Sequence, residues 1–209
     1  MERKIYIVRH GETDMNRREC LQGHIDCELN DKGIREAQAS KELFKAAGIE
    51  FGRVYSSPLK RAVQTAKIIS GRDDMTPEPL IIEMHFGDSE GRPYKEIDEK
   101  MWAFIHDPEN TAPPEGVEAI SELTGRTGEF IRRLLSENDD ENVLIVTHGI
   151  ALRSILWNLY DEGERASVWS MPIENCIVYE LTAENGKVTN IRRAEELSKK
   201  SSTDTSGAF

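Results

Sequence analysis

The chain has 209 residues, of which 38% are hydrophobic and 31% charged, a balance typical of a globular domain in water. Its 38 acidic residues outnumber its 27 basic ones, which gives a formal net charge of −11. Nucleic acids and anionic membranes favour clustered lysine and arginine, so the composition argues against both as partners. The length predicts a single domain over residues 1–200, and the Ser/Thr-rich tail 201–209 is expected to be disordered.

The first part of the chain predicts two strands separated by a helix. Apolar, mostly β-branched residues 5–8 form the first strand. A helix capped by Asn30 or Asp31 then runs to about Ala47, just before a glycine. Residues 53–56 form the second, shorter strand.

The middle of the chain is expected to be richer in helices and loops. Pro58 suits the first turn of a helix that continues to about Ile69, and residues 79–83 read as a third short strand. Residues 87–115 are polar and broken by Gly and Pro, which predicts a helical insertion that acts as a lid. Residues 116–138 show the apolar spacing of an amphipathic helix.

The last part begins with residues 143–146, the clearest buried strand, followed by a helix over residues 150–160. Residues 176–181 and 187–192 are expected to pair as a hairpin around Asn185-Gly186. Strands and helices therefore alternate through most of the chain. This order predicts an α/β fold, a three-layer α/β/α sandwich with a mostly parallel central sheet.

Three cysteines, Cys20, Cys27 and Cys176, are too few and too irregularly spaced for a disulfide framework or a zinc ribbon. The N-terminus carries three charged residues at positions 2–4 before a short apolar run. That pattern fits neither a signal peptide nor a membrane anchor. We therefore expect a cytoplasmic protein.

Two of the predicted strands end in His-Gly, as Val8-Arg9-His10-Gly11 and as Val146-Thr147-His148-Gly149. Ligands of open α/β sheets sit at the carboxyl ends of the strands, so neighbouring strands would turn both histidines toward one pocket. A histidine there can act as a nucleophile, and an arginine beside it can hold an anion. The pattern points to phosphate chemistry on histidine.

Four sequence blocks, taken in order, resemble the histidine phosphatase superfamily, also called the phosphoglycerate mutase-like family. The resemblance covers roughly residues 4–181. The blocks are Arg9-His10-Gly11-Glu12-Thr13 with Asn16; Ser56-Ser57-Pro58-Leu59-Lys60-Arg61 through Thr65; Glu83 with Phe86-Gly87 and Glu90-Gly91; and Thr147-His148-Gly149.

The resemblance implies a role for each of five residues. His10 would attack a phosphoryl group and become phosphohistidine, with its other ring nitrogen donating to a nearby carbonyl. Arg9 and Arg61 would bind the phosphoryl oxygens, and a protonated His148 would add a further positive donor. Glu83 would give a proton to the leaving oxygen and later activate water.

The same resemblance assigns further residues to the substrate site and implies no metal and no other cofactor. Gly11 and Gly149 would let the backbone approach the ligand closely, because neither has a Cβ. His85 either borders the substrate or is an ordinary loop histidine. The residues assigned to substrate binding are Asn16, Gln22, Gly23, Gly11, Gly149 and His85.

The block Glu83-Met84-His85-Phe86-Gly87 separates the two activities of the family. The mutases carry Arg where this chain has Met84, and a methionine cannot bind a substrate carboxylate. We therefore expect a phosphatase that acts on a small phosphorylated metabolite, similar to the broad-specificity and α-ribazole phosphatases, which this sequence does not separate. The alternative is a bisphosphate-dependent phosphoglycerate mutase. A non-catalytic phosphate-binding module is disfavoured because the catalytic set is complete, and a homodimer through the terminal hairpin stays open.

Overall fold

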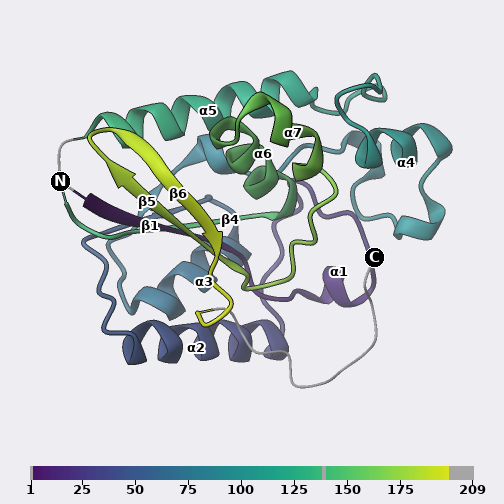
Figure 1. Cartoon of the computed structure of the whole chain (residues 1–209). Coiled ribbons are helices and arrows are strands. Elements are labelled where there is room, and N and C mark those ends of the chain that lie inside the picture. Colours follow the sequence, from purple (N-terminus) through teal and green to yellow (C-terminus); the bar gives the residue numbers. More distant parts are fainter. Residues whose placement is uncertain (1, 138–139, 198–209) are drawn as a thin grey trace.

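The computed structural model describes residues 2–137 and 140–197, built around a six-stranded sheet (Figure 1). Its strands are β1 (Glu2–Arg9), β2 (Arg53–Ser56), β3 (Thr76–Pro77), β4 (Val143–Thr147), β5 (Val178–Glu184) and β6 (Lys187–Arg193). They lie in the order β3-β2-β4-β1-β5-β6, where β3, β2, β4 and β1 are parallel and β5 and β6 are antiparallel. The expected α/β class with a mostly parallel sheet is confirmed.

Helices cover both faces of the sheet (Figure 1). Helices α2 and α3 pack together on one face, and α5 and α6 pack together on the other. The helices are α1 (Asp14–Arg17), α2 (Asp31–Ala46), α3 (Lys60–Ser70), α4 (Glu99–His106), α5 (Ile120–Ser136), α6 (Gly149–Leu159) and α7 (Glu162–Val168), and short 3₁₀ turns are η1 (Pro79–Ile81), η2 (Gly87–Ser89) and η3 (Tyr94–Glu96). None of the helices in the described ranges is long and apolar enough to cross a membrane.

Alternating side chains of the central strands divide the hydrophobic core into two layers. On β1, Ile5 and Ile7 pack with residues of α5 and α6, whereas Tyr6 and Val8 pack with residues of α2 and α3. The neighbouring β4 alternates in the same way. Because successive residues of a strand point to opposite faces, a continuous apolar run is the pattern expected when both faces are covered.

The register of β1 against β4 brings the two His-Gly motifs together. Val8 lies opposite Val146, and Arg9 lies opposite Thr147. The backbone N–H of His10 donates to the carbonyl of Thr147 at 2.9 Å. His10 and His148 therefore leave the sheet at the same level, on adjacent parallel strands, as the sequence predicts.

Local signals set most element boundaries. The side chain of Asn30 accepts a hydrogen bond from the backbone N–H of Gly33, so it is the cap at the start of α2. At the terminal hairpin, Asn185 and Gly186 both have positive φ, 49° and 76°, as a tight turn between β5 and β6 requires. The helix predicted from Pro58 begins slightly later, because Leu59 is the N-cap of α3.

The strand expected over residues 79–83 is wrong. Residues Pro79–Ile81 form the 3₁₀ turn η1, and the edge strand β3 ends earlier, at Pro77. The Glu78 side chain accepts from the backbone N–H of Leu80 at 3.0 Å and so caps this turn. Because Pro79 lacks an N–H, it suits the first position of such a turn better than a strand.

The segment expected to be a lid contains η2, η3 and helix α4, with loops between them. Met101 and Phe104 of α4 pack against Leu21, Met84 and Phe86 in a third apolar cluster. The cluster joins this segment to the loop that carries Glu83. The tail expected to be disordered, residues 201–209, lies outside the described residues.

Gly11 stands where β1 passes close to the start of α2. A Cβ on Gly11 would lie 2.5 Å from the carbonyl oxygen of Gly33, which is backbone and cannot rotate away. We expect Gly11→Ala to lower the free energy of unfolding by about 1–3 kcal/mol, as other overpacking substitutions do. Gly125→Ala is the control, because on α5 a Cβ there meets nothing within 4 Å and should stabilise the helix by about 0.5–1 kcal/mol. Urea unfolding of both variants checks this, and equal stabilities would contradict it.

Candidate active site

His10 is held in one orientation at the end of β1. Its Nδ1 lies 2.7 Å from the carbonyl oxygen of Gly11, an acceptor that requires the proton on Nδ1. The carbonyl of His10 accepts from the side-chain amide of Asn175 at 2.9 Å, and the N–H of Gly11 donates to the Thr65 hydroxyl at 3.0 Å. Burial, with the charges of Arg61 and Arg9, lowers the pKa of His10 well below its usual range. The ring is therefore neutral, with the lone pair on Nε2.

His148 lies beside His10, with 5.2 Å between the ring centroids, and is buried. Its Nδ1 accepts from Nε of Arg61 at 3.2 Å, and its Nε2 lies 2.7 Å from the Ser57 hydroxyl. Burial, followed by the charge of Arg61, lowers the pKa of His148 well below its usual range. His148 is therefore neutral in the unliganded site, because Arg61 occupies the nitrogen that would carry the second proton. A protonated His148 beside a bound phosphoryl group stays a prediction.

Arg61 is fully buried at the start of α3 and connects three parts of the site. Besides its contact with His148, it donates from Nη2 to the carbonyl of Gly23 and from Nη1 to that of Ile25, both at 2.7 Å. Gly23 has a φ of +49°, and a Cβ there would lie only 2.0 Å from Oε1 of Glu90, so the position requires glycine. The guanidinium therefore joins the loop between α1 and α2 to His148.

Arg9 offers a donor without a partner. Its Nη1 donates to the carbonyl of Ile173, but its buried Nε has no hydrogen-bond partner among the described residues. A buried N–H of this kind is costly unless a ligand satisfies it. A Cβ on Gly149 would lie 3.8 Å from Nε of Arg9 and 3.8 Å from Oε2 of Glu83, so these two groups flank the same glycine.

Glu83 accepts hydrogen bonds at the N-terminus of α6, directly after His148. Its Oε1 accepts from the N–H groups of Met84 at 3.0 Å and Ala151 at 2.9 Å, whereas Oε2 has one longer contact, 3.3 Å, with the N–H of Ile150. Oε1 is thus occupied by two amides. Oε2 is therefore the freer of the two oxygens among the described residues.

The other predicted substrate residues lie in two groups. Asn16 and Gln22 are tied to Thr13: its N–H donates to Oδ1 of Asn16 at 3.1 Å, and its hydroxyl donates to Oε1 of Gln22 at 2.9 Å. His85 lies farther out, with a side chain that is 46% exposed and an Nδ1 that donates to the carbonyl of Gly116 at 3.0 Å. His85 contacts the His24 ring, so it belongs to the rim rather than to the buried group.

Several residues near the site have no role assigned by the four sequence blocks. Ser57 and Thr65 stood in a recognised block without an assigned role, and Asn175 had no signal at all, because only the fold brings it to His10. Arg153 on α6 is a third arginine near the site: burial, with the charge of Arg9, lowers its pKa. The Tyr94 hydroxyl lies near the charges of Arg9 and Glu83, and burial raises its pKa.

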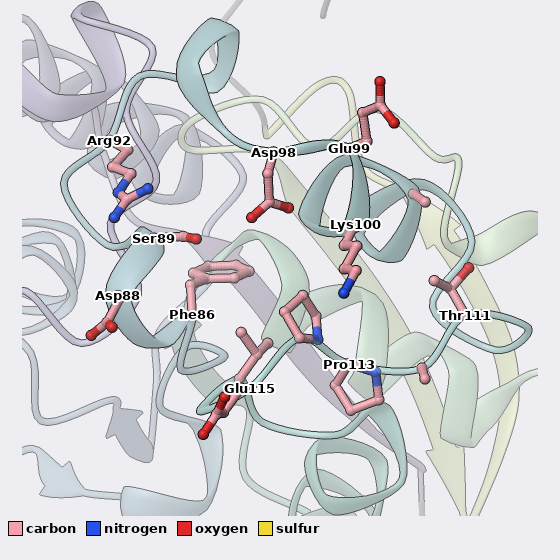
Figure 2. A pocket seen from close by; sticks show the side chains of 14 residues that line it. Phe86, Asp88, Ser89, Arg92, Asp98, Glu99, Lys100, Thr111, Pro113 and Glu115 are labelled. Carbon is pink, nitrogen blue, oxygen red and sulfur yellow. The ribbon is translucent and has the colours of Figure 1, made fainter.

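A separate cavity of about 720 Å³ lies between η2, helix α4 and the loop of residues 111–115 (Figure 2). Phe86 forms part of its lining, whereas His10, Glu83 and His148 do not. Its charged side chains, among them Asp98 and Lys100, are exposed to solvent. The predicted catalytic residues therefore lie apart from this cavity, which belongs to the lid segment.

The buried neutral histidines make stability depend on pH. On unfolding, His10 and His148 regain their ordinary pKa of 6.5, so below that pH the unfolded chain binds protons that the folded protein does not. Stability is thus full at higher pH and falls as pH drops, by about 1.4 kcal/mol per pH unit for each histidine. Urea unfolding between about pH 7 and 5 should give a shallower slope for His148→Asn than for the wild type. His106→Asn, on the exposed end of α4, should leave the slope unchanged; equal slopes for all three proteins would contradict the account.

Comparison with known proteins agrees with this geometry. The profile of the histidine phosphatase superfamily (branch 1) matches residues 5–195. Phosphoglycerate mutase-like protein 4 of Arabidopsis thaliana is 36% identical over 160 residues, which cover 73% of this chain and 69% of that protein. Adenosylcobalamin/alpha-ribazole phosphatase of Salmonella typhimurium is 35% identical over 179 residues, which cover 82% of this chain and 86% of that protein.

The fold is also found among solved structures. YhfR of Bacillus stearothermophilus has a TM-score of 0.78 and 27% identity, over 91% of this chain and 95% of that one. The family profile spans every block that carries the buried histidines, arginines and Glu83. The chain belongs to the histidine phosphatase superfamily.

Proposed function

We propose that this protein is a phosphomonoester phosphatase that works without a metal ion, through a phosphohistidine on His10. The proposal is supported by a neutral, oriented His10 that is close enough to Arg9 for its pKa to be lowered by that charge, by the Nε of Arg9, which has no partner among the described residues, and by the Glu83 carboxylate on the other side of Gly149. The first supplies a nucleophile, the second a cationic donor for a phosphoryl oxygen, and the third a group that can move a proton.

The reaction proceeds in two balanced steps. In the first, the lone pair of His10 Nε2 forms a bond to phosphorus, the bond from phosphorus to the ester oxygen breaks, and Glu83 gives its proton to the departing alcohol. In the second, Glu83 takes a proton from water, the water oxygen attacks phosphorus, and the bond between phosphorus and His10 breaks. Inorganic phosphate leaves, and both residues return to their starting state.

Arg9 and Arg61 stabilise the charge that spreads over the phosphoryl oxygens. Arg61 keeps its backbone contacts while it does so, which makes its position independent of the ligand. His148 enters the site as a neutral ring whose Nδ1 is paired with Arg61. A phosphoryl oxygen that accepts the hydrogen bond from Nε of Arg61 would free Nδ1 of His148 to take up a proton.

The surroundings of Met84 favour a phosphatase over a mutase. Its side chain is 2% exposed and packs against Leu21 and Phe86 in the cluster beneath the lid segment. It therefore offers nothing to a substrate carboxylate, which a phosphoglycerate mutase must hold. The similarity to the Salmonella typhimurium phosphatase supports the same choice. The substrate class we propose is a small phosphorylated metabolite.

Phosphate release in the presence of EDTA tests this function. The panel contains p-nitrophenyl phosphate, α-ribazole 5′-phosphate, sugar phosphates, nucleoside monophosphates and 3-phosphoglycerate. A parallel assay follows 2-phosphoglycerate after priming with the bisphosphate. We expect release from at least one ester at a rate that EDTA does not lower. Interconversion of the phosphoglycerates without phosphate release would make the protein a mutase, and release that EDTA abolishes would refute the metal-free mechanism.

A further inference from the structure

Glu83 lies in a backbone segment that belongs to no helix or strand. Residues 82–86 follow the turn η1 and precede η2, without a partner strand to hold them. A group that transfers a proton must stay within a few tenths of an ångström of its place, because small displacements cost large factors in rate. Something else in the fold must therefore fix this segment.

Arg126, on the middle of α5, contacts two carbonyls of this segment and one of the preceding turn η1. Its Nη1 donates to the carbonyl oxygens of Leu80 at 2.8 Å and Ile82 at 2.7 Å, and its Nη2 donates to that of Glu83 at 3.0 Å. One planar guanidinium thus donates the hydrogen bonds to backbone carbonyls that a neighbouring strand would otherwise donate. A lysine ammonium could not reproduce this fork.

Glu118 holds Arg126 in turn and adds contacts of its own. Its two carboxylate oxygens accept from Nε and Nη2 of Arg126 at 2.6 Å and 2.9 Å. It also brackets His85, whose N–H donates to the Glu118 side chain at 3.2 Å and whose carbonyl accepts from the Glu118 N–H at 2.9 Å. The side chains of the pair are only 17% and 14% exposed, so water screens the contact weakly.

We propose that the Arg126–Glu118 pair is a positioning device for the Glu83 carboxylate: Arg126 acts through the backbone of residues 80–83 to hold that carboxylate at the N-terminus of α6. This inference rests on the proposed role of Glu83 as proton donor. His24 supports the same carbonyl of Glu83 from the loop after α1, with Nε2 at 2.8 Å. Arg126 touches no reacting atom, so its effect should appear only where the proton transfer limits the rate.

The test compares Arg126→Gln with Arg132→Gln, a matched control because Arg132 is exposed on the same helix. Each variant is assayed for kcat/KM, which reports the step that expels the leaving group, on an alkyl phosphate and on an activated aryl phosphate. An alkoxide is a poor leaving group and needs a proton from the general acid as it departs, whereas an activated phenolate leaves without one. We expect Arg126→Gln to lower kcat/KM about 10- to 100-fold on the alkyl ester and less than about 3-fold on the aryl ester. Arg132→Gln should change neither.

A double variant identifies the residue through which Arg126 acts. In the Glu83→Gln background, Arg126→Gln should cost nothing further on the alkyl ester, because the group that it positions is already gone. If the losses in kcat/KM of the two single variants multiply in the double variant, the inference is overturned. An equal loss on both esters in Arg126→Gln alone, or no loss on either, would also overturn it. Should Arg126→Gln fail to fold by circular dichroism, Glu118→Gln carries the same test with the same criteria. If Glu83→Gln alone lowers kcat/KM equally on both esters, the proposed role of Glu83 fails instead.

Discussion

His10→Ala should lower kcat/KM at least about 1,000-fold on every ester, including an activated aryl phosphate, because the neighbouring neutral ring of His148 has the lone pair of its Nδ1 occupied by Arg61. The structure gives His10 one task for each nitrogen: Nδ1 is fixed on the Gly11 carbonyl, and Nε2 carries the lone pair. Steady-state kinetics on two esters of different leaving-group strength measure the loss. His106→Ala, on the exposed end of α4, is the matched control and should retain full turnover.

A control must show that His10→Ala still folds and still binds phosphate, so that its loss of activity reports the missing nucleophile. In His10→Ala, Arg9 and Arg61 remain in place, so the variant should still bind inorganic phosphate. Binding to the folded state raises the midpoint of thermal unfolding, and this shift should persist in the variant. A variant that keeps both the shift and its turnover would show that His10 is not the nucleophile.

Arg61→Lys is the second large effect that we expect. It keeps a positive charge but removes the fork that holds His148, Gly23 and Ile25 at once. Since the side chain is fully buried, some of these acceptors would lose their partner without gaining water. We expect kcat/KM to fall about 100-fold or more and the free energy of unfolding to fall by about 2–4 kcal/mol.

Kinetics and urea unfolding of the same preparation measure both effects of Arg61→Lys. Arg35→Lys, an exposed position on α2, is the matched control and should change neither quantity. Wild-type activity in Arg61→Lys would mean that charge alone is sufficient, which would contradict the role given to the fork.

The sheet and the pairing of its two catalytic strands could be predicted because their signals are local and repeated. An apolar run covering both faces identifies β1 and β4, and each ends in His-Gly. The hairpin was equally accessible, since Asn185-Gly186 supplies the two positive φ values that the turn needs. These features depend on neighbours in the sequence, which a single chain displays directly.

What could not be predicted depends on contacts between distant residues. Residues 79–83 look like a strand by composition, but their carbonyls bond to the side chain of Arg126, 43 to 46 residues away. The neutral state of His148 in the unliganded site could not be predicted, because the sequence does not show that its Nδ1 faces Arg61. Asn175 reaches His10 only through the antiparallel return of β5. In each case a hydrogen bond between residues far apart in the sequence determines the local structure or the protonation state. The periodicity of the sequence carries no information about such a bond.

The central claim is that a phosphoryl group passes through His10, and the most direct measurement is to trap it there. Glu83→Gln should be mixed with an activated aryl phosphate, which needs no acid to form the intermediate but needs the missing base to hydrolyse it. Quenching in alkali and mass spectrometry of the peptides would then locate the group. We predict a burst of one phenol per active site and one phosphoryl group on the peptide that carries His10. Turnover without a burst, or a phosphoryl group on another residue, would contradict the account.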